Sequence, residues 1–211
     1  MALSVDTPQA STNGPSRGKI VVLNGFPGTG KLTIFKNIEA QLSSQDVQVV
    51  DNHLIIDPAQ AVDRGLNHYY LRRQMRKVYY NEIRKMASQG CLVLMTACLV
   101  DNEADLKVLD EHLDIVRGTD ISMVWVNIRC EQQILEQRVT SLERVQGSKT
   151  KLTDVEMLRR MIKRNRLLIP SSRRSKLDGI DLTTSSLDVS GTIEEAVDKV
   201  SAVMQGESSR L

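Results

Sequence analysis

The sequence predicts one α/β domain, a parallel five-stranded sheet wound on both faces by helices into a three-layer αβα sandwich. Strand-like and helix-like segments alternate through residues 18–204, which is the pattern of parallel sheets covered on both faces. The strand-like segments are mostly short, continuous apolar runs, as expected for strands buried on both sides. Hydrophobic residues make up 41% of the 211 residues, enough for one core. Residues 1–17 and 205–211 are small and polar, and we expect a disordered tail at each end.

The first half of the chain contains three predicted strands. Lys19–Asn24 is an apolar run that ends before a glycine, and Val47–Asp51 and Cys91–Thr96 are similar runs. Apolar residues recur at helical spacing between these runs, which predicts helices over Leu32–Leu42 and Tyr69–Ala87. Strand, helix and strand in succession favour parallel pairing.

The second half continues the alternation. A helix over Asn102–Leu113 precedes a strand over Ile121–Ile128 and a helix over Glu131–Leu142. A basic helix over Thr153–Leu168 and a short fifth strand over Gly179–Thr183 follow. The last helix begins at Thr192, whose hydroxyl can cap it while Glu195 reaches back as in a capping box.

A glycine-rich segment joins the first strand to the first helix, and it is the most informative motif in the chain. It is a P-loop of the Walker A kind, in which backbone N–H groups and a helix N-terminus surround phosphates. Lys31 supplies a positive charge for the β- and γ-phosphates. An ordinary turn with an exposed lysine is disfavoured, because the strand before and the helix after are both present. The predicted nucleotide-binding residues of the motif are Gly25, Phe26, Pro27, Gly28, Thr29, Gly30, Lys31, Leu32 and Thr33.

Leu32 occupies the position where most P-loops have a magnesium-binding hydroxyl. A hydroxyl follows one residue later at Thr33, and magnesium would otherwise be held by phosphates, water and another group. We predict Thr33 and Asp51 as its protein ligands. GTPases and motor ATPases depend on the missing hydroxyl, so these classes are disfavoured. The sequence has no N-K-x-D motif for guanine, and Thr96 stands where many P-loop proteins have an aspartate after the third strand.

The loop resembles that of nucleoside monophosphate kinases, whose pattern is G-x-P-G-x-G-K-G-T, with Leu32 replacing a glycine. Shikimate kinases similarly lack the aspartate after the third strand. Shikimate kinases and chloramphenicol phosphotransferases use an aspartate at the end of the second strand, so the resemblance implies that Asp51 is the general base. A turn or helix cap is the alternative role for Asp51. His53, and Thr96 across the crevice, are further predicted substrate contacts, although a structural role for His53 remains open.

Arginines of the long helix after the second strand are candidate acceptor ligands. Arg72 and Arg76 are four residues apart and share a helix face, whereas Arg73 points elsewhere. In the kinases that this chain resembles, arginines of this segment hold the acceptor's phosphate or carboxylate. On that basis Arg73 and Arg76 are predicted to bind substrate, with ordinary solvent exposure as the alternative.

The basic charge of the chain is concentrated in one block. Residues 138–176 contain 12 Lys and Arg and 3 Asp and Glu, although the whole chain carries only +2. Small P-loop kinases have a lid with transition-state arginines here, so we predict a lid over about residues 143–166, with Arg138 and Arg144 as catalytic residues. Arg138 would also contact the nucleotide, and Gly147–Lys149 is expected to be a mobile tip. A solvated basic helix face, or a surface for RNA or acidic partners, is the alternative.

Over residues 19–204 the chain resembles a group of small fungal and bacterial P-loop proteins of AAA type or kinase type. The resemblance rests on GFPGTGKLT, DNHLIIDP, and Arg138…Arg144 followed by Lys151-Leu152-Thr153-Asp154. It implies that Leu182–Ser185, placed after the last strand, contacts adenine, which makes Thr184 and Ser185 candidate nucleotide ligands.

These features together predict an ATP-dependent kinase that uses ATP and Mg²⁺ and phosphorylates a hydroxyl or phosphate of a small molecule. A nucleotide-binding switch with little catalysis is the main alternative, and a nucleic-acid-binding protein is a weaker one, since the net charge is small. The three cysteines have no metal-type spacing, and neither a signal peptide nor a membrane-spanning run is recognisable. We therefore expect a cytoplasmic protein with no nucleic-acid or membrane partner. The acceptor and the oligomeric state are open.

Overall fold

The structure is a computed structural model that describes residues 18–42, 46–147, 151–170 and 177–206. Five strands form one sheet in the order β2-β3-β1-β4-β5, and every pair is parallel. This confirms the predicted fold. The strands are β1 (Lys19–Asn24), β2 (Val47–Val50), β3 (Leu92–Ala97), β4 (Ser122–Arg129) and β5 (Leu182–Asp188).

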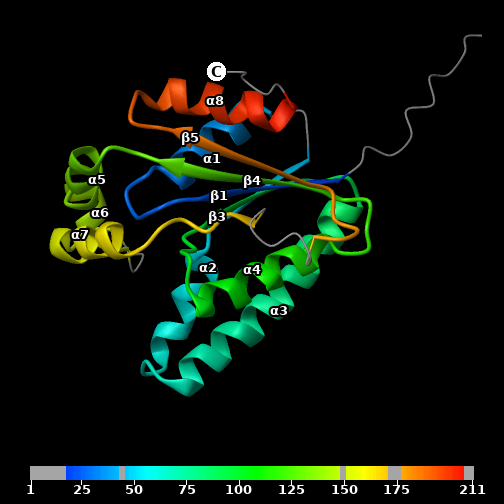
Figure 1. Cartoon of the computed structure of the whole chain (residues 1–211), viewed down its shortest axis with the longest axis horizontal. Coiled ribbons are helices and arrows are strands. Elements are labelled where there is room, and N and C mark those ends of the chain that lie inside the picture. Colours follow the sequence, from blue (N-terminus) through cyan, green and yellow to red (C-terminus); the bar gives the residue numbers. More distant parts are fainter. Residues whose placement is uncertain (1–17, 43–45, 148–150, 171–176, 207–211) are drawn as a thin grey trace, which may run out of the picture.

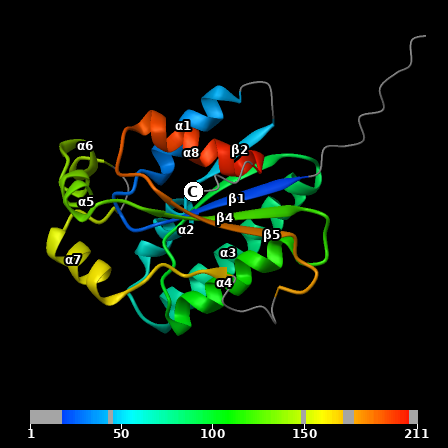
Figure 2. The same cartoon turned by 45° about the horizontal axis from the view of Figure 1, so that its top comes forward.

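Helices cover both faces of the sheet. In Figure 1, α1 and α8 lie over one face, α3 and α4 lie over the other, and α5, α6 and α7 gather beyond the end to which the β4 arrow points. The same group stands apart at that end in Figure 2. Among the described residues, no helix is long and apolar enough to cross a membrane. The helices are α1 (Lys31–Gln41), α2 (His53–Ile56), a 3-10 turn (Pro58–Ala61), α3 (Leu66–Ser88), α4 (Glu103–Val116), α5 (Gln132–Val139), α6 (Leu142–Val145), α7 (Val155–Arg164) and α8 (Ile193–Gln205).

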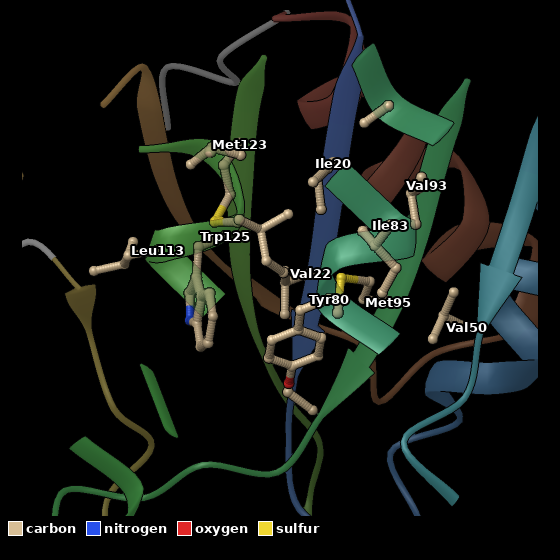
Figure 3. Close-up of a cluster of buried hydrophobic side chains, with 14 of the residues drawn as sticks. Ile20, Val22, Val50, Tyr80, Ile83, Val93, Met95, Leu113, Met123 and Trp125 are labelled. Atoms are coloured by element: carbon tan, nitrogen blue, oxygen red, sulfur yellow. The ribbon is translucent and has the colours of Figure 1, made fainter. Parts of the chain in front are cut away.

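The apolar strands form two cores because successive side chains of a strand point to opposite faces. In β1, Ile20 and Val22 belong to the core under α3 and α4, which Figure 3 shows in close-up. Val21 and Leu23 belong to the second core, together with Phe35 of α1 and residues of α8. All four β1 side chains are fully buried. A central strand of this kind must be apolar at every position, which explains the continuous runs in the sequence.

A histidine is buried in the core under α4. The imidazole of His112 hydrogen-bonds to the Val108 carbonyl oxygen at 2.7 Å and to the Tyr80 hydroxyl at 3.0 Å. The ring of Trp125 packs edge-on against it, with 5.7 Å between ring centroids. Burial lowers the pKa of His112 from 6.5 to about 4, and burial also raises the pKa of Tyr80.

The stability of the fold should therefore depend on His112 at mildly acidic pH. Between pH 6.5 and about 4 the unfolded chain binds a proton at His112 that the folded chain does not. The free energy of unfolding should fall by about 1.4 kcal/mol per pH unit through this range from His112 alone. Urea unfolding of the wild type and of His112→Gln at pH 4.5, 5.5 and 7 would measure it. The wild type should lose more stability with falling pH than the variant, and parallel curves would contradict the assignment.

Several predicted boundaries were wrong. The fifth strand was expected over Gly179–Thr183 but β5 extends to Asp188, because it pairs with β4 as far as Arg129 opposite Asp188. The predicted helix over residues 131–142 is interrupted at residues 140–141 and becomes α5 and α6. The basic helix is shorter than expected, since Asp154 caps its start and the chain is no longer helical after Arg164.

The terminal and loop-tip predictions fall mostly outside the described residues. The structure does not describe residues 1–17, 148–150 or 207–211, so the predicted N-terminal tail and the predicted tip at Ser148 and Lys149 remain predictions. At the other end of the domain, α8 continues to Gln205 and is capped by Gly206, one residue beyond the predicted domain limit. The Thr192 hydroxyl accepts a hydrogen bond from the Glu195 amide at 3.2 Å, which confirms the predicted cap.

Candidate active site

The glycine-rich loop leaves the carboxyl end of β1 and enters α1. Its start is attached to the neighbouring strand, where the Gly25 amide donates to the Ala97 carbonyl oxygen at 3.2 Å. The loop is closed on itself by the Thr29 hydroxyl, which donates to the Phe26 carbonyl oxygen at 2.8 Å. Gly28 and Gly30 have φ values of 90° and 83°, a region that residues with a Cβ rarely adopt. The glycines are therefore required by the backbone of the loop.

We expect Gly28→Ala to disrupt the loop. A Cβ at this position would lie 3.1 Å from the Leu135 carbonyl oxygen and 3.2 Å from a methyl carbon of Val139. Strain at positive φ costs about 1–3 kcal/mol, and the close contacts would push the loop away from α5. Gly118→Ala is the matched control, because Gly118 has φ 70° but open space around it. Thermal unfolding and ATP titration should show lower stability for both variants and weakened ATP binding only for Gly28→Ala; equal ATP affinity in both would contradict it.

The first turn of α1 is open to an anion. Side-chain oxygens cap α4, α7 and α8, at Asn102, Asp154 and Thr192. In α1 the cap residue is Gly30, and the structure records neither a side-chain cap bond nor an acidic residue in the first turn. The N–H groups of a first turn carry partial positive charge and need acceptors. A phosphate at the loop would supply them.

Lys31 already lies within the loop. Its ammonium donates to the carbonyl oxygens of Gly25 and Phe26 at 2.6 and 3.1 Å and to the Thr29 hydroxyl at 3.3 Å. Burial lowers the pKa of Lys31 below its ordinary value; Arg144 adds to this, whereas Cys98 and Asp51 act in the opposite direction. The positive charge of Lys31 thus contacts only neutral oxygens in the loop. An anionic phosphate would be a more favourable partner, because a buried charge is stabilised by an opposite charge.

Asp51 lies directly after β2, next to the end of β3. Only 7% of the residue is exposed, and its carboxylate accepts hydrogen bonds from the His53 amide at 3.2 Å and the Thr96 hydroxyl at 3.3 Å. The Thr96 hydroxyl in turn accepts from the Asn52 amide at 3.0 Å. The two predicted residues Asp51 and Thr96 therefore meet, and the contact orients the carboxylate. The charge of Asp51 acts to raise the pKa of Lys31, against the lowering by burial.

His53 has a mainly local partner. Its Nδ1 lies 3.1 Å from a carboxylate oxygen of Asp57, one helical turn further on. Both side chains are largely buried, with 18% and 30% exposed. The pairing favours the structural role that the sequence left open, and a substrate contact by His53 remains a prediction.

Two arginines of the predicted lid approach the phosphate loop. Arg138 lies in the last turn of α5, and one of its terminal nitrogens lies 3.8 Å from the Cys130 sulfur and 3.9 Å from the position that a Cβ on Gly30 would occupy. Arg144, on α6, donates through Nε to the Leu152 carbonyl oxygen at 2.8 Å. Its charge lowers the pKa of Lys31, and burial lowers the pKa of Arg144 itself. Arg138 therefore lies beside the loop at Gly30, and the catalytic roles of Arg138 and Arg144 remain predictions.

The helix that carries Arg138, α5, is joined to α7 by an ion pair. Arg159 of α7 makes a two-pronged ion pair with Glu136 of α5, at 2.8 and 2.7 Å. This pairing, and a hydrogen bond from Gln132, lower the pKa of Glu136 to about 2. A small apolar core beneath the pair includes Leu158, and Phe26 of the phosphate loop packs against it. Arg159 of the basic block is thus paired with a carboxylate of α5, although its side chain is 48% exposed.

Two buried asparagines join the strand ends, and the sequence analysis missed them. Asn24 donates to Asn127 Oδ1 and to the Leu99 carbonyl oxygen, each at 3.0 Å, and accepts from the Leu99 amide at 2.7 Å. Asn127 also accepts from the Trp125 indole at 3.1 Å and donates to the Leu168 carbonyl oxygen at 3.1 Å. A polar residue within an otherwise apolar strand was the available signal.

The segment that leaves α7 is tied to the loop after β3. The Asp101 amide donates to the Arg166 carbonyl oxygen at 2.9 Å, and the Leu168 amide donates to the Leu99 carbonyl oxygen at 3.1 Å. Val100 and Leu167 form an antiparallel bridge between these bonds. Backbone hydrogen bonds therefore join residues 166–168, which follow α7, to residues 99–101, which follow β3.

The three arginines of α3 differ in exposure and in ion pairing, and the predicted substrate ligands Arg73 and Arg76 both lie near one carboxylate. Arg76, with 12% of its side chain exposed, is paired with Glu111 at 2.6 Å. Arg73 is 73% exposed and lies 3.6 Å from the same carboxylate. Arg72 was not selected from the sequence, yet its Nε is buried and has no hydrogen-bond partner among the described residues. All three line a cavity of about 600 Å³ between α3 and α4 that also reaches Thr96.

Comparison with models of protein families identifies the family of the chain. The model of the family described as chloramphenicol phosphotransferase-like protein matches residues 18–158. The chain belongs to this family. A comparison with curated protein sequences finds no match.

Solved structures similar to this chain include several kinases. A sugar kinase from a Janibacter species is 14% identical, with a TM-score of 0.58 over 90% of this chain and 96% of that chain. The APS kinase of Mycobacterium tuberculosis, in complex with AMPPNP and APS, is 18% identical, with a TM-score of 0.52 over 90% and 99%. Shikimate kinase from Acinetobacter baumannii, in complex with shikimate, is 12% identical, with a TM-score of 0.52 over 93% and 97%. At these identities the likeness shows the fold.

The two residues predicted to contact adenine lie at a different place in the fold than expected, and their contact with the nucleotide remains a prediction. Thr184 and Ser185 were expected after the last strand, but they lie within β5, opposite Trp125 and Val126 of β4. The strand continues to Asp188, and ligands of parallel sheets bind beyond the strand ends. The prediction that these two residues follow the strand was therefore wrong.

Magnesium fits the site as an ion held mainly by the nucleotide. Within the described residues, no group of three or more His, Cys, Asp and Glu side chains could hold a metal ion. Mg²⁺ usually takes one or two carboxylates and completes its shell with phosphates and water, and Asp51 offers such a carboxylate. Thr33 lies exposed on the first turn of α1. The roles of Thr33 and Asp51 as metal ligands remain predictions.

Proposed function

We propose that the chain is an ATP-dependent kinase that transfers the γ-phosphoryl group of ATP to a hydroxyl or phosphate of a small molecule. The observation that carries the proposal is the phosphate loop itself, in which Gly28 and Gly30 have positive φ and the Lys31 ammonium is held within the loop by the carbonyl oxygens of Gly25 and Phe26. Phosphoryl transfer needs positive charge around the moving group and a positioned acceptor, and little covalent chemistry from the protein. The family match is consistent with such a reaction.

Each residue has a defined part in the proposed reaction. Lys31 and the loop amides bind the β- and γ-phosphates, and Arg138 and Arg144 neutralise charge on the group in transfer. An acceptor hydroxyl forms a bond to the γ-phosphorus while its proton passes to the Asp51 carboxylate, and the bond to the leaving ADP oxygen breaks. Thr96 holds that carboxylate in place. Bound Mg²⁺ would neutralise phosphate charge and orient the triphosphate.

The direct test is ADP release from Mg-ATP with and without a panel of acceptors. The panel contains nucleoside monophosphates, sugar acids, shikimate and chloramphenicol. At least one acceptor should stimulate ADP release, and phosphorylated product should appear in equal amount. Slow release that no acceptor changes, together with tight ATP binding, would instead favour the nucleotide-binding switch that Leu32 makes plausible.

A further inference from the structure

The backbone and the side chain of Phe26 belong to different parts of the molecule. Its carbonyl oxygen lies in the phosphate loop, where it accepts a hydrogen bond from the Lys31 ammonium at 3.1 Å. Its side chain leaves the loop and packs against the small apolar core of Leu135, Val139 and Leu158. The first two of these core residues belong to α5 and the third to α7. One residue of the phosphate loop is therefore also part of the core between two helices.

The helix α5 lies against the phosphate loop at two further points. The backbone of Gly28 lies so close to α5 that a Cβ there would be 3.1 Å from the Leu135 carbonyl oxygen. A terminal nitrogen of Arg138 lies 3.9 Å from the Cβ position of Gly30. The ion pair described above joins α5 in turn to α7, and Figure 2 shows the two helices together at one end of the sheet. Contacts thus run without a break from the loop through α5 to α7.

The helix α7 is buried mainly through this small core. Leu158 is its buried residue, and Val155 and Ile162 are partly buried against the same core, whereas Met157 is 44% exposed. A helix with so few buried apolar contacts opens locally at a low cost in free energy. The order of α7 should therefore respond to a change in how the small core is filled.

A phosphate in the loop would change the surroundings of the Phe26 carbonyl. The Lys31 ammonium contacts neutral oxygens, one of them the Phe26 carbonyl oxygen, and a phosphate is a more favourable partner for it. When Lys31 turns to a phosphate, the Phe26 carbonyl loses one of its donors. The peptide group that is next to the ring can then adjust, and the ring lies in the small core.

We propose that Phe26 is a positioning residue that couples phosphate in the loop to the order of α5 and α7. An occupied loop fixes the ring in the small core, the filled core orders both helices, and Arg138 of α5 is held beside Gly30. The inference rests on the proposed function, because it assigns how the nucleotide regulates that same site. Coupling between two sites commonly changes an equilibrium by about 5- to 150-fold.

Amide hydrogen exchange of α7 tests the inference without requiring turnover. AMPPNP should slow exchange over residues 155–164 of the wild type by about 5- to 150-fold, and tripolyphosphate, which fills the loop without an adenosine, should act similarly. At saturating AMPPNP the slowing should decrease with side-chain size through Phe26→Leu, Phe26→Val and Phe26→Ala. Ile162→Ala is the matched control, since it removes apolar surface from the same core on the side of α7. Its α7 should exchange faster in the free protein and should still be slowed by AMPPNP.

A purely structural role for Phe26 predicts a different result. If the ring only fills the core, each Phe26 variant should lower the Tm and speed the exchange of α7 to the same extent with and without AMPPNP. Equal slowing by AMPPNP in the wild type and in the Phe26 variants that bind it would overturn the inference. AMPPNP binding that leaves the exchange of α7 in the wild type unchanged would overturn it too. The Leu and Val variants keep an apolar side chain, so the comparison stands even if Phe26→Ala does not fold.

Turnover separates this inference from the kinase proposal. With an acceptor that is phosphorylated, Phe26→Ala should lower kcat about 10-fold and leave the KM for the acceptor nearly unchanged, since a small misplacement of a catalytic group is costly. Leu42→Ala is the control for lost stability, because Leu42 is partly buried in the core under α8, at the C-terminal end of α1. Its kcat should stay close to that of the wild type.

The two proposals can fail separately. Wild-type kcat in every folded Phe26 variant would overturn the role of Phe26 in the reaction while supporting the kinase. Slowing of exchange in α7 that depends on both AMPPNP and Phe26, without transfer to any acceptor, would support the inference and count against the kinase.

Discussion

Replacing Lys31 with alanine should reduce kcat/KM for phosphoryl transfer by at least about 10²- to 10³-fold. The ammonium is held within the phosphate loop by three oxygens, and no other lysine lies in the loop sequence. Without it, the loop loses the charge that is expected to follow the β- and γ-phosphates through the transition state. Acceptor-stimulated ADP release is the measurement, made with the acceptor that the panel identifies.

Lys36→Ala is the control for this substitution. Lys36 lies on the same helix, α1, but its side chain is exposed, so its loss should change kcat/KM by less than about twofold, as is usual for surface charges. Unfolding curves of both variants would show whether the fold is intact. Substantial transfer by a folded Lys31→Ala protein would contradict the assignment of Lys31.

The second large effect is expected for Asp51→Asn. An amide cannot accept the proton of an acceptor hydroxyl, so transfer should fall by about 10²- to 10⁴-fold. ATP affinity measured without Mg²⁺ should change much less than transfer, because the carboxylate accepts hydrogen bonds from the Thr96 hydroxyl and the His53 amide. Single-turnover phosphorylation and ATP titration would separate the two quantities.

Asp63→Asn provides the matched control, since Asp63 lies in the same connecting region and is exposed. Thr96→Val tests the support of Asp51 independently, and a smaller loss of transfer is expected because the carboxylate remains. An Asp51→Asn protein that transfers phosphate at nearly the wild-type rate would exclude Asp51 as the general base.

The central strands could be predicted from the sequence because a strand buried on both faces is apolar at every position. Every residue of Ile20–Leu23 is apolar, whichever face it points to. β5 lacks such an apolar run: it lies at one edge of the sheet, opposite the β2 edge, pairs with β4, and contains Thr and Ser. Its polar composition suits an edge, and the same composition led us to end the strand five residues too early.

One part of the candidate site could likewise be predicted from the sequence, and another part could not. The phosphate loop is local in sequence, so glycine spacing between a strand and a helix was enough to predict it. The choice among the α3 arginines depends on Glu111, which is 35 residues from Arg76 along the chain. Spacing on α3 could show that Arg72 and Arg76 share a face, but not that a carboxylate of α4 neutralises only one of them. The buried donor of Arg72 became visible only in three dimensions.

The backbone hydrogen bonds of the segment after α7 suggest where the predicted lid could be exchanged between related proteins. The bonds that join Arg166 and Leu168 to Asp101 and Leu99 fix the point where the lid re-enters the domain. The helices α6 and α7 thus lie between this exit and the break at residues 140–141. A chimaera spliced at these two points would replace α6 and α7 and leave the strand-end asparagines in place. The segment that contains α6 and α7 could then be exchanged between relatives without changing any residue of the five strands.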